Sequence, residues 1–259
     1  MSLEEIYDLK PDESQLLFSS DNPAEIIEVR EWQQFRWLHL GDRSVQAVMQ
    51  TNEPEQIMLP NIQAMLVALL FNPEPERLLN LGLGGASLER YLCAQWPELK
   101  VTSVESNKKI IELAEQYFYL PDEIEVKHEL ADRFIKSCSE SYDIALCDIF
   151  VADNQASCLY DKNFYENMSK CINANGILAI NILPESEEDV VNVLLPIKDY
   201  FDYLYLLEFP DFSNAVIFAS RQKIPGVDVL CKRAEELNKN TLLDLTALPE
   251  NIHVLLETV

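Results

Sequence analysis

The stretch LLNLGLGGASLERYL, residues 78–92, decides the fold of this chain. An apolar run at 78–81 enters a turn that contains Gly82, Gly84 and Gly85, and a helix-like segment follows. Strand, glycine turn and helix begin the crossover units that bind nucleotides, because backbone approaches a ligand closely only where side chains are absent. The stretch therefore predicts a parallel α/β sheet with a nucleotide site at its glycine turn.

The segments that follow continue this alternation. Expected strands lie at 78–81, 100–106, 123–130, 142–150 and 176–183. Expected helices lie between and after them, at 87–94, 107–118, 132–138, 162–172 and 187–201. Such alternation predicts βαβ units and a mostly parallel sheet. Two further strands, 203–209 and 214–220, are joined by only PDFS, which is too short for a crossover helix, so they are expected to be antiparallel.

The ends of the chain have a different pattern. Expected strands at 25–31, 35–40 and 44–50 form a meander, and a helix with one apolar face follows at 61–71. A last helix is expected at 226–238. These features predict three parts: an N-terminal segment with a small β domain (1–60), a nucleotide-binding domain (61–222) and a C-terminal helical tail (223–259).

Composition narrows the classes of function. The 259 residues are 48% hydrophobic, enough for a substantial core, and carry a net charge of −24 from 20 basic and 44 acidic side chains. Binding to nucleic acid requires basic side chains to neutralise phosphates, so this charge argues against it. The same charge attracts cations, including polyamines.

The sequence predicts a cytoplasmic protein without a metal site or a membrane partner. No apolar run reaches the roughly 20 residues of a membrane helix, and the acidic N-terminal segment lacks the apolar region of a signal peptide. The six cysteines form no C-x-x-C pair and have no histidine at zinc spacing, which indicates reduced thiols.

Glu105 narrows the kind of nucleotide. It ends the strand that follows the glycine turn, 23 positions after Gly82, where an acid can accept hydrogen bonds from both ribose hydroxyls. Dinucleotide enzymes and S-adenosyl enzymes share this arrangement. Ser87 stands where the dinucleotide fingerprint has its third glycine, and the hairpin at 203–220 is typical of the edge of a methyltransferase-like sheet. Both features favour an S-adenosyl ligand.

Several segments together resemble the spermidine and spermine synthase family over residues 22–222. The resemblance rests on the opening stretch and on VTSVES (101–106), YDIALCDIF (142–150) and LYDKNFYENMSKCINANGILAINIL (159–183). GDRSVQ (41–46) is similar to the family's N-terminal hairpin, and FSNAVIFAS (212–220) to a late strand. The resemblance implies a Rossmann-like, doubly wound sheet of the S-adenosylmethionine-methyltransferase type with a small N-terminal β meander.

The resemblance also implies a reaction. Members of this family bind decarboxylated S-adenosylmethionine, and a neutral amine of putrescine or spermidine attacks the carbon beside its sulfonium, releasing 5′-methylthioadenosine. Because amines are protonated at neutral pH, a carboxylate must remove a proton. The implied partner is therefore a small amine or polyamine, no metal is required, and a homodimer is compatible with the pattern.

The resemblance also implies roles for individual residues. It places the nucleotide against Gly82, Gly84, Gly85 and Glu105, and makes Asp148 an amine-holding acid. Tyr160 corresponds to the tyrosine of the family's Leu-Tyr pair and is a candidate substrate contact. Leu130 aligns with an aspartate that contacts adenine in the family, and Glu129 or Asp132 is the candidate replacement.

This sequence differs from the family pattern at two positions that take part in the reaction. The glycine loop of the family contains an acid that binds the donor's amine, whereas the loop here contains none. The catalytic base of the family falls on Val151, which cannot accept a proton, and Asp153 is the candidate surrogate. We therefore expect slow or absent transfer to standard polyamines unless Asp153 acts. The alternatives are an S-adenosylmethionine-dependent methyltransferase and a catalytically silent nucleotide-binding or interaction protein.

Overall fold

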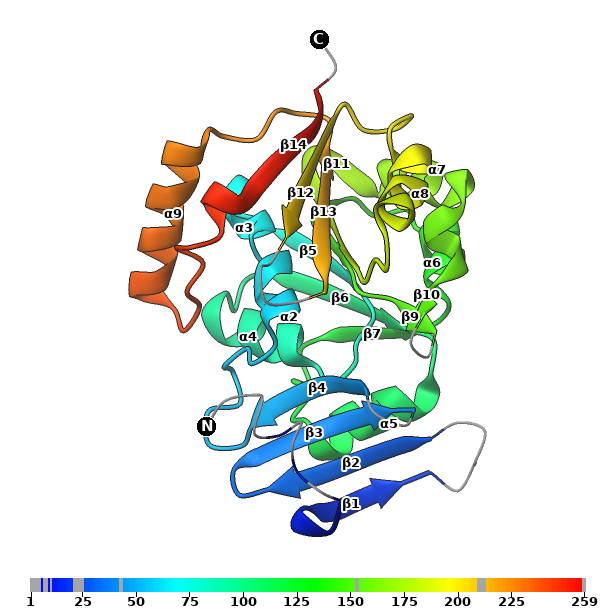
Figure 1. Cartoon of the computed structure of the whole chain (residues 1–259), viewed down its shortest axis with the longest axis vertical. Helices are drawn as coiled ribbons and strands as arrows, with labels where there is room; N and C mark the ends of the chain where they lie inside the picture. The colour runs from blue at the N-terminus through cyan, green and yellow to red at the C-terminus, as the bar shows by residue number, and fades with distance from the viewer. Residues whose placement is uncertain are drawn as a thin grey trace.

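The chain is organised around two sheets. The computed structural model describes residues 6, 9, 11–20, 26–41, 44–151, 154–208 and 213–257. In this part of the chain a four-stranded antiparallel sheet, formed near the N-terminus, lies beside a larger eight-stranded sheet (Figure 1). A short 3-10 helix, η1 (Pro11–Glu13), precedes the first strand.

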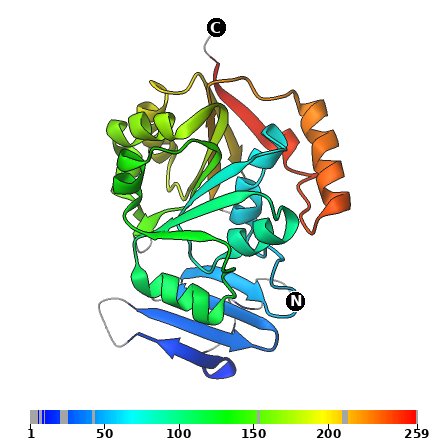
Figure 2. The same cartoon turned by 180° about the vertical axis from the view of Figure 1, so that it is seen from behind.

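The smaller sheet confirms the predicted meander and adds a strand to it. Its order is β1 (Gln15–Ser19), β2 (Ile27–Trp32), β3 (Phe35–Leu40) and β4 (Ser44–Gln50). Strand β1 was not predicted, because QLLFS has no clear alternation and its strand state comes from pairing with β2. Helix α5 (Lys108–Tyr117) packs against this sheet through Ile110 and Leu113 (Figure 2).

The larger sheet has the order β14-β12-β13-β11-β8-β5-β6-β7. Its strands are β5 (Arg77–Leu81), β6 (Lys100–Glu105), β7 (Glu125–His128), β8 (Tyr142–Cys147), β11 (Ile172–Ile182), β12 (Tyr203–Glu208), β13 (Ala215–Ser220) and β14 (Ile252–Glu257). Strands β5 to β8 and β11 run parallel, while β13 is antiparallel to both β11 and β12, as predicted. The chain moves outward from β5 to β7 and then returns to the other side of β5 with β8. Ligands bind at such a reversal in open α/β sheets.

Helices cover both faces of the larger sheet. One apolar cluster holds side chains of α2 (Pro60–Met65), α3 (Ala68–Phe71), α4 (Ser87–Gln95) and α9 (Val227–Asn240). The cluster on the other face holds those of α6 (Ala131–Ser137), α7 (Lys162–Cys171) and α8 (Glu187–Ile197). Helices on both faces confirm the doubly wound α/β fold.

Two expectations about individual elements were wrong, and the C-terminal segment contains more than its predicted helix. The helix at 61–71 is broken at Leu66 and Val67, whose N–H groups bond three residues back. The strand at 142–150 ends at Cys147, and β9 (Phe150–Val151) then pairs with β10 (Asn154–Gln155). The C-terminal segment contains, besides α9, the 3-10 helix η3 (Pro249–Asn251) and strand β14. Pairing of β14 with β12 is a long-range contact that local sequence does not encode.

The division of the chain at residues 60 and 222 stays a prediction, as does its cytoplasmic location. Among the described residues, no helix is both long and apolar enough to cross a bilayer.

Candidate functional site

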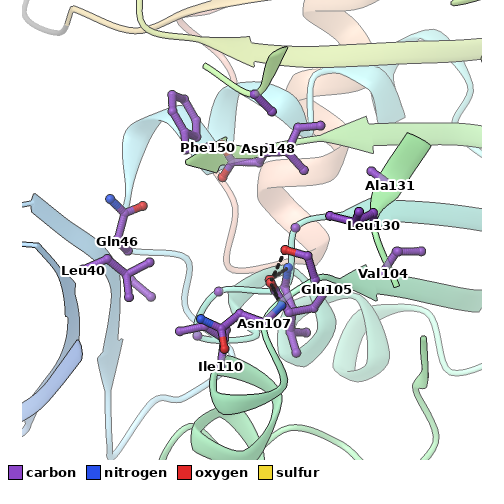
Figure 3. Close-up of a pocket in the computed structure, with 18 of the residues that line it drawn as sticks. Leu40, Gln46, Val104, Glu105, Asn107, Ile110, Leu130, Ala131, Asp148 and Phe150 are labelled. Carbon is purple, nitrogen blue, oxygen red and sulfur yellow. Dashed lines mark hydrogen bonds between the residues drawn. The ribbon is translucent and has the colours of Figure 1, made fainter. Parts of the chain in front are cut away.

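A cavity of about 560 Å³ lies where the carboxyl ends of β5, β6 and β8 meet the smaller sheet (Figure 3). The glycine turn, the end of β6, the start of α6 and the segment after β8 form one side of it. Leu40 and Gln46 of the smaller sheet face it from the opposite side. The cavity thus lies between the smaller sheet and the point where the strand order of the larger sheet reverses.

The three glycines of the turn have different surroundings. Gly82 has φ +100°, and a Cβ there would lie 2.2 Å from the carbonyl oxygen of Asp148. A Cβ on Gly85 would lie 2.5 Å from Cβ of Ala47, so this position is needed for packing on β4. Gly84 has φ +51°, and its Cβ would meet nothing within 4 Å. Gly84 therefore leaves backbone open to the cavity, where a ligand can approach it.

The carboxylate of Glu105 is fixed at the end of β6. Its Oε2 accepts a hydrogen bond from the Leu83 N–H at 3.2 Å, and its Oε1 accepts one from the Asn107 N–H at 2.8 Å. These bonds join the acid to the glycine turn and to the first residues before α5. Glu105 lines the cavity (Figure 3), and its predicted role as a ribose contact stays a prediction.

An apolar wall continues from Glu105 toward α6. Ile110, Leu130 and Ala131 line this part of the cavity. Leu130 is 46% exposed. Glu129 precedes Leu130 and Asp132 follows Ala131, and both acids also line the cavity. Apolar surface bordered by acceptors suits a purine ring with an exocyclic amine.

Asp148 follows β8 and belongs to a chain of amides. Asn181 of β11 donates from Nδ2 to Oδ1 of Asp148 at 2.7 Å, and Asn214 donates to Oδ1 of Asn181 at 3.1 Å. Burial raises the pKa of the Asp148 carboxyl, and the hydrogen bond from Asn181 opposes this rise. Asn181 is 1% exposed and was missed in the sequence, where its signal is one polar residue within the apolar run ILAINIL.

The structure gathers most of the predicted site residues around this cavity. Those on its lining are Gly82, Gly84, Gly85, Glu105, Asp132 and Asp148. Tyr160 ends the 3-10 helix η2 (Ser157–Tyr160), is 44% exposed and is not on the lining. Asp153 lies outside the described residues, and Val151 ends β9. The roles assigned to these residues stay predictions.

The charge of the cavity has one sign. Its described lining contains four carboxylates, Glu105, Glu129, Asp132 and Asp148, and no lysine, arginine or histidine. Low-dielectric walls lined by one sign of charge concentrate ligands of the opposite sign. The arrangement therefore favours a cation. Within the described ranges, no group of three or more His, Cys, Asp or Glu residues could hold a metal ion.

Comparison with known sequences identifies relatives. The polyamine aminopropyltransferase of Chromobacterium violaceum is 27% identical over 82% of this chain and 83% of that protein. The polyamine aminopropyltransferase of Neisseria meningitidis serogroup B is 28% identical over 84% of this chain and 85% of its own length. The eEF1A lysine and N-terminal methyltransferase of Homo sapiens is 26% identical over 63% of this chain, but only 27% of that protein is covered.

Solved structures show the same fold. A probable spermidine synthase from Corynebacterium glutamicum matches with a TM-score of 0.74 at 14% identity, covering 93% of this chain and 90% of that one. Spermidine synthase in complex with the transition-state analogue AdoDATO has a TM-score of 0.64 at 17% identity, over 87% and 79% of the two chains. Human methyltransferase-like protein 13 in complex with SAH has a TM-score of 0.60 at 19% identity, over 70% and 88%.

The family model described as the spermine/spermidine synthase domain matches residues 63–229. This range runs from α2 to the first turn of α9 and contains the glycine turn, Glu105 and Asp148. It covers more than half of the sequence, and the chain therefore belongs to the spermine/spermidine synthase family.

Proposed function

We propose that this protein binds decarboxylated S-adenosylmethionine in the cavity and transfers the aminopropyl group to a small amine. The observation that carries the proposal is the described lining, with four carboxylates and no cationic side chain. The donor has a sulfonium and an ammonium group, and both are stabilised by nearby carboxylates. The acceptor amine is also a cation before it reacts.

The same charges favour the decarboxylated donor over S-adenosylmethionine. The carboxylate of S-adenosylmethionine would enter a cavity whose described lining offers it no lysine, arginine or histidine. Two like charges about 4 Å apart repel by about 4 kcal/mol at an effective dielectric constant near 20. The missing acid in the glycine loop, which weakens recognition of the donor's amine, is offset by the acids that remain.

Glu105 and Asp148 would divide the chemistry between them. Glu105 would accept hydrogen bonds from the ribose hydroxyls, with Ile110 and Leu130 beside the adenine. Val151 cannot accept a proton, and Asp153, the surrogate expected from the sequence, lies outside the described residues. In this proposal Asp148 would therefore both hold the attacking amine and take its proton. Asn181 occupies only Oδ1 of Asp148, and no described residue bonds Oδ2. A carboxylate whose pKa is raised by burial is a stronger base than an exposed one.

Calorimetry with three nucleotides tests the donor. Decarboxylated S-adenosylmethionine should bind at least tenfold more tightly than S-adenosylmethionine, because it lacks the carboxylate that the acidic cavity repels. 5′-Methylthioadenosine should bind measurably, since it retains the adenosine contacts. Equal or tighter binding of S-adenosylmethionine would favour the methyltransferase alternative instead.

Replacing Glu105 with alanine should weaken 5′-methylthioadenosine binding by at least tenfold. Each charge-assisted hydrogen bond to a ribose hydroxyl contributes about 1.5–3 kcal/mol at most. Glu123→Ala is the matched control, because Glu123 is exposed and does not line the cavity. Thermal unfolding of both variants separates lost binding from lost folding. Unchanged affinity in folded Glu105→Ala protein would exclude this ribose site.

A further inference from the structure

Three polar side chains are buried together beneath the glycine turn. Asn80 lies on β5, Glu89 on α4 and Ser103 on β6, and each is 0% exposed. None of them lines the cavity. Burial of a carboxylate without a compensating cation is costly, so this cluster requires an explanation.

The hydrogen bonds of the cluster converge on one oxygen of Glu89. Its Oε1 accepts from Nδ2 of Asn80 at 2.6 Å and from Oγ of Ser103 at 2.5 Å. The same Nδ2 of Asn80 also donates to the carbonyl oxygen of Gly82 at 2.8 Å. Two atoms are left buried without a partner, Oε2 of Glu89 and Oδ1 of Asn80. Both are acceptors when the acid is ionised, so neither can bond the other.

A single proton on Oε2 would turn one of these two acceptors into a donor. The acid O–H can then donate to Oδ1 of Asn80, while Nδ2 of Asn80 donates to Oε1, closing a cyclic acid–amide pair. No described cation forms an ion pair with Glu89. The adjacent Arg90 directs its guanidinium to backbone carbonyls of Pro54, Gly85 and Phe118 instead.

The other groups around Glu89 do not cancel the effect of its burial. Burial raises the pKa of the Glu89 carboxyl, and the hydrogen bonds from Ser103 and Asn80 and the charge of Arg90 oppose this rise only in part. Glu105, the acid at the end of β6, is bonded to backbone N–H groups of the loop and not to Glu89. Strand β4, which packs against α4, has no titratable side chain.

We propose that Glu89 is a neutral carboxylic acid paired with Asn80, and that this pair positions the glycine turn for its nucleotide. The link to the turn is the second N–H of Asn80, which holds the Gly82 carbonyl. The protonation state follows from the cluster alone, whereas the positioning role rests on the proposed nucleotide binding. Glu89 is thus a positioning residue that does not touch the ligand.

The protonation state can be measured without any ligand. Infrared difference spectra of wild type minus Glu89→Gln, recorded at neutral pH, should show the carbonyl band of a protonated acid. Ser103→Ala is the matched control: it removes a bond to Oε1 that favours the charged form, so the acid band should remain. A carboxylate band, or titration of Glu89 in the ordinary carboxyl range, would overturn the proposal.

Stability should depend on pH in a way that Glu89→Gln removes. The folded protein keeps a proton on Glu89 that the unfolded chain releases above its ordinary pKa, so wild-type stability falls as pH rises toward the folded pKa. Glutamine supplies an N–H donor in place of the acid O–H and cannot titrate. Melting temperatures from about pH 5 to about pH 9 should therefore fall more steeply for wild type than for Glu89→Gln. Parallel curves would contradict a neutral Glu89.

Nucleotide titrations test the positioning role separately. At neutral pH, 5′-methylthioadenosine should bind Glu89→Gln within about twofold of wild type, whereas Asn80→Ala should lose about three- to tenfold through its bond to Gly82. If wild type does not bind the nucleotide, the proposed function fails while the infrared result still decides the state of Glu89. If Asn80→Ala is folded and binds as wild type does, the positioning role is wrong.

Discussion

Replacing Asp148 with asparagine is expected to slow aminopropyl transfer by about 10²–10⁴-fold, the usual contribution of a general base. Asparagine keeps the size of the side chain and can still pair with Asn181, but it cannot accept a proton. Release of 5′-methylthioadenosine from decarboxylated S-adenosylmethionine, with putrescine as acceptor, measures the rate. Affinity for the nucleotide should stay within a few-fold, because the role proposed for Asp148 is to hold the amine and not the nucleotide.

The pH dependence of the transfer rate tests whether Asp148 is the general base. Because burial raises the pKa of Asp148, the rate should rise with pH through a value above the ordinary aspartate range. Asn181→Leu removes the hydrogen bond that lowers this pKa, so the rising limb should move to higher pH. A wild type inactive with every amine would refute the proposed transfer and leave nucleotide binding intact. Full activity of Asp148→Asn would place the base elsewhere, and Asp153→Asn would then be the next variant.

Gly82→Ala is expected to destabilise the protein by about 2–6 kcal/mol, because a left-handed backbone and a steric clash act together. The added Cβ would lie 2.2 Å from the backbone oxygen of Asp148. Neither backbone segment can move away easily, because both are hydrogen-bonded to neighbouring strands. The Gly82 N–H donates to the Val104 carbonyl oxygen at 2.9 Å, and the Asp148 N–H donates to the Leu81 carbonyl oxygen at 2.8 Å. The midpoint of urea unfolding measures the loss.

Gly84→Ala is the matched control for this variant. Gly84 also has a positive φ, but its Cβ would point into open space, so we expect a cost of only about 1–2 kcal/mol. Its effect should appear instead in nucleotide affinity, since the new methyl group stands where a ligand approaches the backbone. Equal destabilisation by the two substitutions would show that backbone strain, and not the contact with Asp148, makes Gly82 necessary.

The sequence was sufficient to predict an element where the element's own apolar periodicity and capping residue mark it. Helix α5 buries Ile110, Leu113 and Ala114 on one face, and the side chain of Asn107 caps its first turn. Such signals lie within a few residues of each other, so the sequence displays them directly. Strands β1 and β14 were missed for the opposite reason, since each depends on a partner strand and has little burial of its own.

The sequence by itself determined the α/β class, the family, and the glycine turn followed by Glu105, because these follow from order and spacing along the chain. Only the tertiary structure decided that Asn181 and Asn214 support Asp148, and that Asn80, Glu89 and Ser103 meet beneath the turn. These groups come from β5, α4, β6 and β11 and from the residues that adjoin β8 and β13, so local sequence does not show that they meet. Their hydrogen bonds depend on the register of neighbouring strands and on the packing of α4, and both are fixed only when the sheet assembles.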